Sequence, residues 1–340
     1  RCSVVFEGLA LLVPVVAFAV AWSLTRGCCR PGSLLYFLDQ PNERSMHTTP
    51  VPRTGGVGVM AGVAAAGLLV WLGAGLDRAL LAALGGALGL AALGLMDDRR
   101  SLSARARFLA QALAAGVFLV LVAPPGGWAL AGLLLLGLVW MANLYNFMDG
   151  ADGLAGGMAL FGFAALGVAA ALAGQLSLAL VCAGIAAAAA GFLCFNFHPA
   201  RIFMGDVGSV PLGFLAGTLG LAGRDAGAWP LWFPLLVFSP FIVDASLTLL
   251  RRALRGEKVW QAHRSHYYQR LVRMGAGHRR TALLAYVLMA GSAVGGLVAL
   301  PLKFSLQCGI ITLCLFIYLI LGWQIDRAWR RHDPAGKPKS

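Results

Sequence analysis

Three clusters of acidic and amide side chains in this sequence have the residue types and spacing of a site for a metal ion and a phosphate. The first is the adjacent pair Asp97 and Asp98, which is followed directly by Arg99 and Arg100. Adjacent carboxylates repel one another unless a cation lies near them, and either a divalent metal ion or an arginine meets that need. A solvated helix end paired with the two arginines is the simpler interpretation of this cluster taken alone.

The second cluster occupies residues 143–154. Asn143, Asn146 and Asp149 are three residues apart, so they form one polar stripe on the last turns of a predicted helix. Two glycines then break the helix and allow backbone to approach a ligand closely, with Asp152 between them. So many polar groups next to apolar segments indicate a binding site rather than a simple turn.

The third cluster occupies residues 195–209. Asp206 and Ser209 come at the start of an apolar segment, so the beginning of that helix can face an anion. A carboxylate beside a phosphate indicates a bridging cation, and Mg²⁺ is commonly held by one or two carboxylates together with phosphate oxygens. Asp206 is equally suited to cap the helix, and the two roles are compatible.

Two further loops carry basic and histidine side chains. The loop at 39–56 contains His47 and Arg53, and the loop at 251–280 contains His263, Arg264 and His266. The two histidines of the second loop are expected on one helical face, but no third soft ligand lies nearby for zinc. Contacts to phosphate are therefore favoured. Near this loop, Asp244 suits two roles equally: an ion-pair partner of Arg251 or Arg252, or a residue of the site.

The segments that carry these side chains lie between long apolar runs. Hydrophobic residues make up 59% of the 340 residues and charged residues 12%, whereas a soluble domain has about 25% charged residues. The runs are continuous rather than alternating, and each approaches the ~20 residues with which a helix crosses a bilayer. We therefore predict an all-α polytopic membrane protein, one integral unit over residues 1–340 with about eleven transmembrane helices. The predicted spans are 8–24, 55–75, 79–96, 106–123, 129–146, 157–173, 177–197, 207–223, 230–250, 280–300 and 304–325.

Basic residues lie mostly on one side of the predicted bundle. Of the 27 lysines and arginines, 23 fall on one side, in segments 25–54, 97–107, 198–206, 251–280 and 326–340. Cytoplasmic loops carry such an excess. We therefore predict a periplasmic N-terminus, a cytoplasmic C-terminus with a basic tail, and polar clusters that face the cytoplasm. The net charge of +13 follows from this topology and from attraction to anionic lipids, so it does not indicate nucleic-acid binding.

The ordered clusters resemble the polyprenyl-phosphate N-acetylhexosamine-1-phosphate transferases, the MraY/WecA superfamily. The resemblance covers residues 39–270 and rests on the acidic pair at 97–98, NxxNxxDGxDGL at 143–154, FNxxPAxxFMGDxGS at 195–209 and the His-rich loop at 263–266. The loop at 39–56 looks most like the WecA branch, which initiates O-antigen. The sequence His-Arg-Ser-His-Tyr-Tyr departs from the patterns of both branches, and Ser101 stands where the WecA branch often has a third Asp.

The resemblance implies that the protein transfers a sugar 1-phosphate, most often that of N-acetylglucosamine, from a UDP-amino sugar to undecaprenyl phosphate in the bacterial inner membrane. UMP is released, and Mg²⁺ (or Mn²⁺) is the implied cofactor. The donor could also carry N-acetylfucosamine or N-acetylquinovosamine. The implied roles are Asp97 and Asp98 as the catalytic pair; Asp206 and Asn146 at the metal; Asp149, Asp152, Asn196, Phe203, His263 and His266 at the nucleotide sugar; and His47, Arg53 and Arg264 at the lipid phosphate.

The chemistry of the implied reaction needs mainly positioning and neutralisation of charge. A phosphate monoester has a second pKa near 6, so the acceptor is mostly dianionic at neutral pH. We therefore favour direct attack by the lipid phosphate, with a covalent aspartyl intermediate as the alternative.

The rival class is a secondary transporter. Its polar groups would lie near the middle of the membrane, at broken helices, whereas the polar clusters here gather at one end of the predicted spans. The sequence leaves open whether the chain forms a homodimer.

Overall fold

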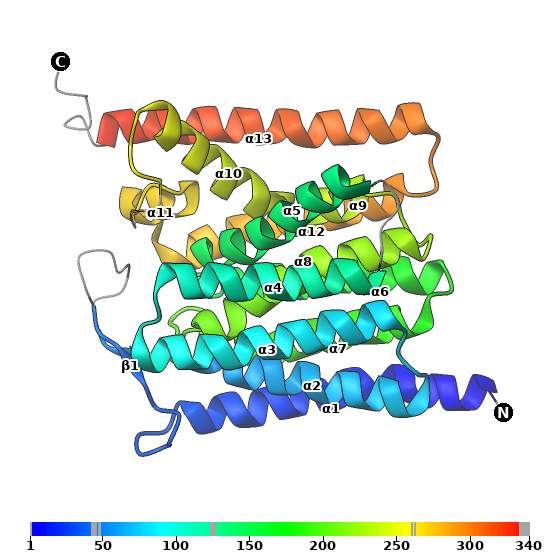
Figure 1. The fold of residues 1–340 in the computed structure, drawn as a ribbon. Helices are drawn as coiled ribbons and strands as arrows, with labels where there is room; N and C mark the ends of the chain where they lie inside the picture. Colours follow the sequence, from blue (N-terminus) through cyan, green and yellow to red (C-terminus); the bar gives the residue numbers. More distant parts are fainter. Residues whose placement is uncertain are drawn as a thin grey trace.

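A computed structural model shows long helices that run side by side, with a small hairpin at one end (Figure 1). It describes residues 2–41, 46, 49–122, 127–259, 261 and 263–332, with the backbone alone at 2–7. The elements in chain order are α1 (Cys2–Cys28), β1 (Leu38–Asp39), β2 (Val51–Pro52), α2 (Gly55–Gly73), α3 (Arg78–Arg100), α4 (Ala104–Val122), α5 (Gly127–Phe147), α6 (Leu154–Leu172), α7 (Leu176–Asn196), α8 (Asp206–Asp225), α9 (Trp232–Val237), α10 (Ser239–Leu254), α11 (Tyr267–Leu271), the π-helical turn η1 (Val272–Ala276), α12 (Gly277–Ala299) and α13 (Phe304–His332).

The prediction of an all-α membrane protein is confirmed. Within the described residues, nine helical segments are long and apolar enough to cross a membrane: α1 to α7, the segment that runs from α11 through α12, and α13. The predicted division between 157–173 and 177–197 is also confirmed, because α6 and α7 are separate helices with a short turn between them. Each of these nine segments coincides with a predicted span.

The two remaining predicted spans differ from this set. The one at 207–223 lies within α8, a 20-residue helix that is about 30 Å long. Helix α8 is not among the nine segments; it is rich in glycine and carries Pro211. The one at 230–250 is divided into α9 and α10, which meet at Phe238. Pro240 lacks the backbone N–H that would bond to the carbonyl oxygen of Leu236 in a continuous helix, which accounts for the division.

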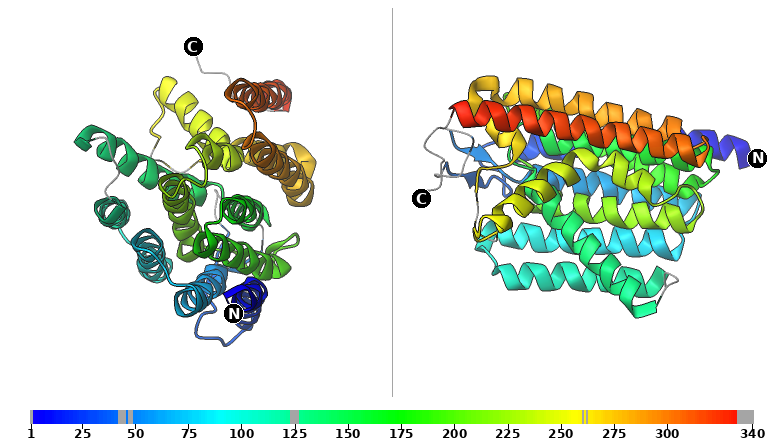
Figure 2. Two further views of the ribbon diagram at one scale, coloured as in Figure 1. Left: turned by 90° about the vertical axis from the view of Figure 1, so that its right-hand side faces the viewer. Right: turned by 90° about the horizontal axis from the view of Figure 1, so that it is seen from above.

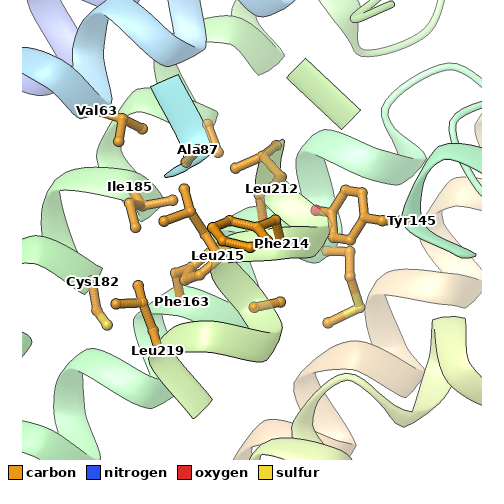
Figure 3. Close-up of a cluster of buried hydrophobic side chains, with 14 of the residues drawn as sticks. Val63, Ala87, Tyr145, Phe163, Cys182, Ile185, Leu212, Phe214, Leu215 and Leu219 are labelled. Carbon is orange, nitrogen blue, oxygen red and sulfur yellow. The ribbon is translucent and has the colours of Figure 1, made fainter. Parts of the chain in front are cut away.

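Helix α8 forms the centre of the bundle. Helices α2, α3 and α5 pack against it, and seen from the end of the bundle it lies among the other helices (Figure 2, left). Figure 3 shows the apolar side chains at this centre: Val63 of α2, Ala87 of α3, Tyr145 of α5, Phe163 of α6, Cys182 and Ile185 of α7, and Leu212, Phe214, Leu215 and Leu219 of α8. Helices in lipid are held by such close van der Waals packing rather than by a hydrophobic force between them.

The two ends of the bundle differ in content. The hairpin β1–β2, the end of α3, the start of α4 and α11 lie at one end, whereas α1 begins at the other (Figure 1). Helix α13 finishes at the same end as the hairpin, so α1 starts and α13 finishes at opposite ends. This arrangement agrees with an odd number of crossings. It also places the ends of the helices that carry the polar clusters together.

Candidate active site

Glycine contacts bring three polar segments together at this end of the bundle. A Cβ atom at Gly94 of α3 would lie 2.6 Å from the carbonyl oxygen of Asp206, so only glycine lets α3 approach the start of α8 this closely. Gly205 has φ of +70°, a conformation that favours glycine, and a Cβ there would lie 2.8 Å from Oδ2 of Asp98. These contacts place the acidic pair of α3 beside the first turn of α8.

The loop at 39–56 reaches the same place through backbone pairing. The N–H groups of Gly55 and Gly56 donate to the carbonyl oxygens of Phe203 and Met204, both at 2.9 Å, and Phe203 N–H donates to Pro52 O at 2.7 Å. The hairpin is thus joined to the segment that precedes α8. This pairing fixes where the side chain of Arg53 enters the site.

Arg107 bridges two of the predicted site residues. Its guanidinium on α4 lies 3.0 Å from Oδ2 of Asp97 and 3.3 Å from Oδ2 of Asp206. The side chain of Asp97 is 9% exposed and that of Asp206 is 22% exposed, so both carboxylates are largely removed from water. Arg107 therefore supplies a cation to Asp97, the first member of the acidic pair, and to Asp206.

Arg53 is the counterpart of Asp98. Its Nε lies 3.5 Å from Oδ1 of Asp98, it also donates to the backbone carbonyl oxygen of Asp98, and its Nη1 lies 3.8 Å from Asp39. Oδ2 of Asp98 is buried and has no hydrogen-bond partner within the described part of the chain. Buried carboxylate oxygens are nearly always paired. Because this one is not, we expect it to receive a cation or a hydrogen-bond donor from a ligand.

Asn146 and Asp149 bring the second cluster to the same region. Ser209 Oγ donates to Oδ1 of Asn146 at 2.8 Å, which joins the end of α5 to the first turns of α8. Burial and repulsion from the charges of Asp206 and Asp98 raise the pKa of Asp149 well above its ordinary value. Charges act strongly only over short distances, so the repulsion from Asp206 and Asp98 indicates that these two carboxylates lie near Asp149. Asn143 is directed elsewhere and donates to Gln111 of α4 at 2.6 Å.

Asp152 lies between two histidines. Its Oδ2 is 2.6 Å from Nδ1 of His198 and accepts the N–H of Ala200 at 3.1 Å, and its Oδ1 is 3.3 Å from Nδ1 of His278. Burial alone would raise the pKa of Asp152, but the bonds to His278 and His198 outweigh it and lower the pKa to about 2. The carboxylate is therefore ionised at neutral pH and joins the second cluster to the third cluster and to α12.

Asn196 and Phe203 hold the third cluster in place. Asn196 accepts the N–H of Gly153 at 3.0 Å through Oδ1 and donates to Ile202 O at 2.9 Å through Nδ2. Both functional atoms of its amide thus bond to backbone, and its role in this structure is to join two of the loops. Phe203 is half-buried in the segment that pairs with the hairpin.

The histidine loop, residues 263–266, differs from its predicted form. His263 and His266 do not share a helical face, because α11 begins only at Tyr267 and His266 stands at its N-terminal boundary. The two rings nevertheless lie 4.8 Å apart, and the ring of His266 stacks on that of Phe147 at the end of α5, at 6.3 Å. Burial and the nearby charges of His266 and Arg252 lower the pKa of His263 to about 4, so its ring is neutral at neutral pH.

Asp244 is the residue that holds this loop. Its carboxylate accepts the N–H groups of Tyr267 and Tyr268 at 2.9 and 3.0 Å, and its Oδ1 lies 3.3 Å from Nδ1 of His266. The alternative of a pairing with Arg251 or Arg252 is wrong, since those arginines bond to Asp326 and Glu257 instead. Arg264 is half-buried in the same loop, and His47 lies outside the described residues.

The donor atoms in this region suit a hard cation. The described residues contain no group of three histidine, cysteine, aspartate or glutamate side chains close enough to hold a metal ion as they stand. Asp98, Asp149 and Asp206 nevertheless converge, and Oδ2 of Asp98 is unpaired. Carboxylate oxygens with an amide oxygen such as that of Asn146 are the ligands that Mg²⁺ prefers. The residues therefore fit Mg²⁺.

Two cavities adjoin these side chains. One, of about 570 Å³, is open to solvent beside Asp98 and is lined by Tyr36, Phe37, Leu38, Arg53, Arg99 and Arg100. The other, of about 440 Å³, is mainly apolar and lies between α10, α12 and α13, where Met148 and Leu154 form its wall next to the second cluster. The region thus offers a basic opening and an apolar one.

Sequence reasoning did not identify Arg107, His198 or His278 as part of this region. Arg107 falls in the basic segment 97–107, which the sequence uses only to predict topology, and its pairing with Asp206 depends on how α4 packs in space. His198 stood inside the third cluster, directly before Pro199, and its position there was the available signal. His278 is 126 residues from Asp152, and nothing in the sequence pairs them.

The fold and the site together define the class: an integral membrane protein with carboxylates and arginines grouped at one end of its helices. Residues 80–224 match the model of glycosyl transferase family 4. A probable undecaprenyl-phosphate N-acetylglucosaminyl 1-phosphate transferase of Bacillus subtilis is 32% identical over 309 residues, which cover 84% of this chain and 81% of that protein.

Two further relatives extend the comparison. An undecaprenyl-phosphate alpha-N-acetylglucosaminyl 1-phosphate transferase of Yersinia pestis is 30% identical, over 86% of this chain and 85% of its own length. A decaprenyl-phosphate N-acetylglucosaminephosphotransferase of Mycobacterium tuberculosis is 31% identical, over 84% and 80%. The chain therefore belongs to glycosyl transferase family 4, the family that its motifs resemble.

Proposed function

We propose that this protein transfers N-acetylglucosamine 1-phosphate from its UDP-sugar to undecaprenyl phosphate and releases UMP. The observation that carries the proposal is the convergence of Asp97, Asp98, Asp149 and Asp206 beside Arg53 and Arg107. The names of the relatives support both the lipid acceptor and the sugar. Initiation of O-antigen or another surface polysaccharide is the pathway role that we propose for the product.

In the proposed reaction, an oxygen of the lipid phosphate attacks the sugar-bearing phosphorus of the donor. A P–O bond forms between the two phosphates, the P–O bond to the UMP phosphate breaks, and UMP leaves with the electron pair. The acceptor phosphate is mostly dianionic at neutral pH, so no strong base is needed. The pair Asp97 and Asp98 would orient the acceptor or take a residual proton, and the unpaired Oδ2 of Asp98 supports this role.

The chain's arginines would neutralise the charges of the two phosphate groups. Arg53 stands at the open cavity together with Arg99 and Arg100, which suits the phosphate of the lipid. The apolar cavity between α10, α12 and α13 suits its hydrocarbon chain. The neutral ring of His263 is suited to hydrogen bonds with the sugar or the diphosphate of the donor rather than to a charge interaction.

Mg²⁺ would be held by Asp206 and Asn146, as the sequence predicts, with Asp98 and Asp149 beside them. When bound, it would neutralise charge on the donor diphosphate. Arg107 already neutralises part of the charge of Asp206. The proposed site faces the cytoplasm of a bacterial inner membrane, where the donor is found.

The test uses purified protein with Mg²⁺, undecaprenyl phosphate and labelled UDP-N-acetylglucosamine. We expect a labelled lipid and an equal amount of UMP. Absence of both products with any UDP-amino sugar would overturn the proposal. A panel with UDP-N-acetylfucosamine and UDP-N-acetylquinovosamine distinguishes the donors, because the one with the highest kcat/KM is the substrate.

A donor with a chiral phosphorothioate at the sugar-bearing phosphorus separates the two mechanisms. Direct attack by the acceptor inverts the configuration, whereas passage through an aspartyl intermediate retains it. We expect inversion.

A further inference from the structure

Helix α13 is bound to its neighbours at the site end by one carboxylate, that of Asp326. Its Oδ1 accepts a hydrogen bond from Arg270 of α11 at 2.8 Å. Its Oδ2 accepts from Arg251 of α10 at 2.6 Å and from the hydroxyl of Tyr267 at 3.4 Å. The side chain of Arg270 is only 9% exposed and that of Asp326 is 19% exposed, so this network is largely shielded from solvent.

Elsewhere along α13, the hydroxyl of Tyr318 hydrogen-bonds to Ser239 of α10 and Ser292 of α12, at 2.7 and 2.8 Å. Gly322 is the one buried residue of α13 among those described, and it faces the ring of Tyr267, whose hydroxyl would lie 3.5 Å from a Cβ at that position. Beyond Asp326, the ring of Trp329 lies under the guanidinium groups of Arg270 and Arg273, at 5.9 and 4.7 Å. The site end of α13 therefore contacts α10, α11 and the turn η1 that follows α11.

An acidic residue near the end of a lipid-facing helix has an energetic cost. Insertion of α13 into the membrane does not need Asp326, because the helix is apolar over most of its length. Its three partners instead belong to α10 and α11. The carboxylate of Asp326 therefore acts on the position of α11.

The histidine loop ends at His266, directly before Tyr267, the first residue of α11. Helix α11 is held from one side by Asp244, which accepts the N–H groups of Tyr267 and Tyr268, and from the other side by Asp326. Arg273 adds a bond to the carbonyl oxygen of Arg264 at 3.4 Å. The orientation of α11 decides where the rings of His263 and His266 stand relative to the acidic cluster.

We propose that Asp326 is a positioning residue for the sugar donor: through Arg270 and Tyr267 it fixes α11, and thereby the place of His263 and His266. The inference rests on the proposed function, in which His263 contacts the donor, and on the donor contact that the family resemblance implies for His266. Asp326 lies on a different helix from the histidines and acts on the reaction only through them. Its removal therefore affects binding of the donor more than binding of the lipid acceptor.

The experiment compares Asp326→Asn, Asp326→Glu and the control Asp225→Asn in the full-length protein. Asp225 forms an ion pair of 2.8 Å with Arg224 at the exposed end of α8, far from the loop in the chain. We expect Asp326→Asn to raise the KM for the UDP-sugar roughly tenfold, with the KM for undecaprenyl phosphate unchanged. Asp326→Glu keeps the charge and restores most of the loss, and Asp225→Asn behaves as the wild type.

Hydrogen exchange of residues 263–273 provides a readout that is independent of activity. We expect faster exchange there in Asp326→Asn and no change in Asp225→Asn. If Asp326→Asn does not fold, Tyr267→Phe removes one hydroxyl of the same network and is expected to shift the donor KM in the same direction by a smaller factor.

The outcomes separate this inference from the proposed function. An inactive wild-type protein would refute the proposed function, whereas exchange measurements would still report on the anchoring of α11. An active wild type with an unchanged donor KM in Asp326→Asn would overturn the inference alone. A lower melting temperature with unchanged kinetic constants, or a change confined to the acceptor KM, would overturn it equally.

Discussion

At the scale of single residues, the site is organised by arginines placed between carboxylates. Arg107 lies between Asp97 and Asp206, and Arg53 lies beside Asp98. Charges that converge in a place shielded from water require such partners. A divalent cation that binds Asp206 therefore competes with Arg107 for the same carboxylate.

This competition gives a prediction for Arg107→Gln. We expect the Mg²⁺ concentration for half-maximal activity to fall about threefold, because the competing guanidinium is gone, and kcat to fall about tenfold, because less positive charge faces the phosphates. Mg²⁺ titrations of the transferase activity measure both. Arg105→Gln, an exposed arginine two residues earlier, is the control. An unchanged Mg²⁺ dependence in Arg107→Gln would contradict the assignment of Asp206 to the metal.

Asp152 gives a prediction of stability against pH. Its pKa is lowered to about 2 in the folded protein, and a carboxyl group with a lowered pKa stabilises the fold above its unfolded pKa of about 3.9. This stabilisation is lost as the pH falls from about 4 to about 2. We expect Asp152→Asn to lower the free energy of unfolding by about 2 kcal/mol at pH 7.

The corresponding measurement is unfolding of wild type and Asp152→Asn in detergent at several pH values. The difference between them is expected to narrow below about pH 4. The exposed Asp225→Asn serves as the control and should show little difference at any pH. A difference that stays constant down to pH 2 would contradict the role given to His198 and His278.

At the scale of elements, the site depends on how closely three helix ends approach one another. A Cβ at Gly56, at the start of α2, would lie 2.6 Å from the Cα of Gly208 in α8 and 2.7 Å from the carbonyl oxygen of Met204. Both contacts are with backbone atoms, which cannot rotate away. The first turn of α8, with Asp206, is therefore placed by its contact with α2.

For this reason, Gly56→Ala is expected to destabilise the protein by about 1–3 kcal/mol and to lower kcat by displacing Asp206. Gly85→Ala is the matched control: a Cβ at this exposed position of α3 would meet no atom within 4 Å. Alanine favours a helix over glycine by up to about 1 kcal/mol, so the control should be as stable as the wild type or more so. Thermal unfolding and transfer assays compare the two. Equal stability of both variants would show that the contact is not needed.

The sequence could predict most elements but not all. Continuous apolar runs predict α1 to α7 well, because a lipid environment requires a helix for each run. The run at 230–250 is predicted as one helix, and it is two because Pro240 interrupts it. The predicted face shared by His263 and His266 was wrong for a related reason: Asp244, distant in sequence, sets where α11 begins.

The clusters of the site could be predicted from the sequence, whereas the bonds between them could not. Spacing within 143–154 and 195–209 indicated polar groups at helix ends, and those ends do meet. Spacing contains no information on which partner an amide meets, so the bonds of both amide atoms of Asn196 to backbone could not be predicted. The nucleotide contact that the resemblance implies for Asn196 stays a prediction. The bridge from Arg107 to Asp206, which are 99 residues apart, also depends on packing alone.

At the scale of the whole molecule, the polar groups lie at one end of the bundle and the excess of basic residues lies in the same segments. The positive-inside rule therefore predicts that this end faces the cytoplasm. Labelling tests this orientation in a background without cysteine. Ser103→Cys lies at the site end, and Ala226→Cys lies in the turn between α8 and α9 at the other end; both positions are exposed.

We expect a membrane-impermeant maleimide to label Ala226→Cys in cells with a permeable outer membrane and Ser103→Cys only after the inner membrane is opened. The reverse pattern would show that the site faces the periplasm. Equal labelling of both positions in closed membranes would show that the reagent had crossed the bilayer, and a bulkier reagent repeats the measurement.

The central place of α8 has a consequence for the order in which the protein is made. Helices α2, α3 and α5, which surround α8, emerge from the ribosome before it, and α11, which carries the histidine loop, emerges after it. The place between these helices is therefore filled only after all three have been made. The histidines join the acidic cluster only late in synthesis, so an incomplete chain that already holds every carboxylate of the cluster still lacks the complete site.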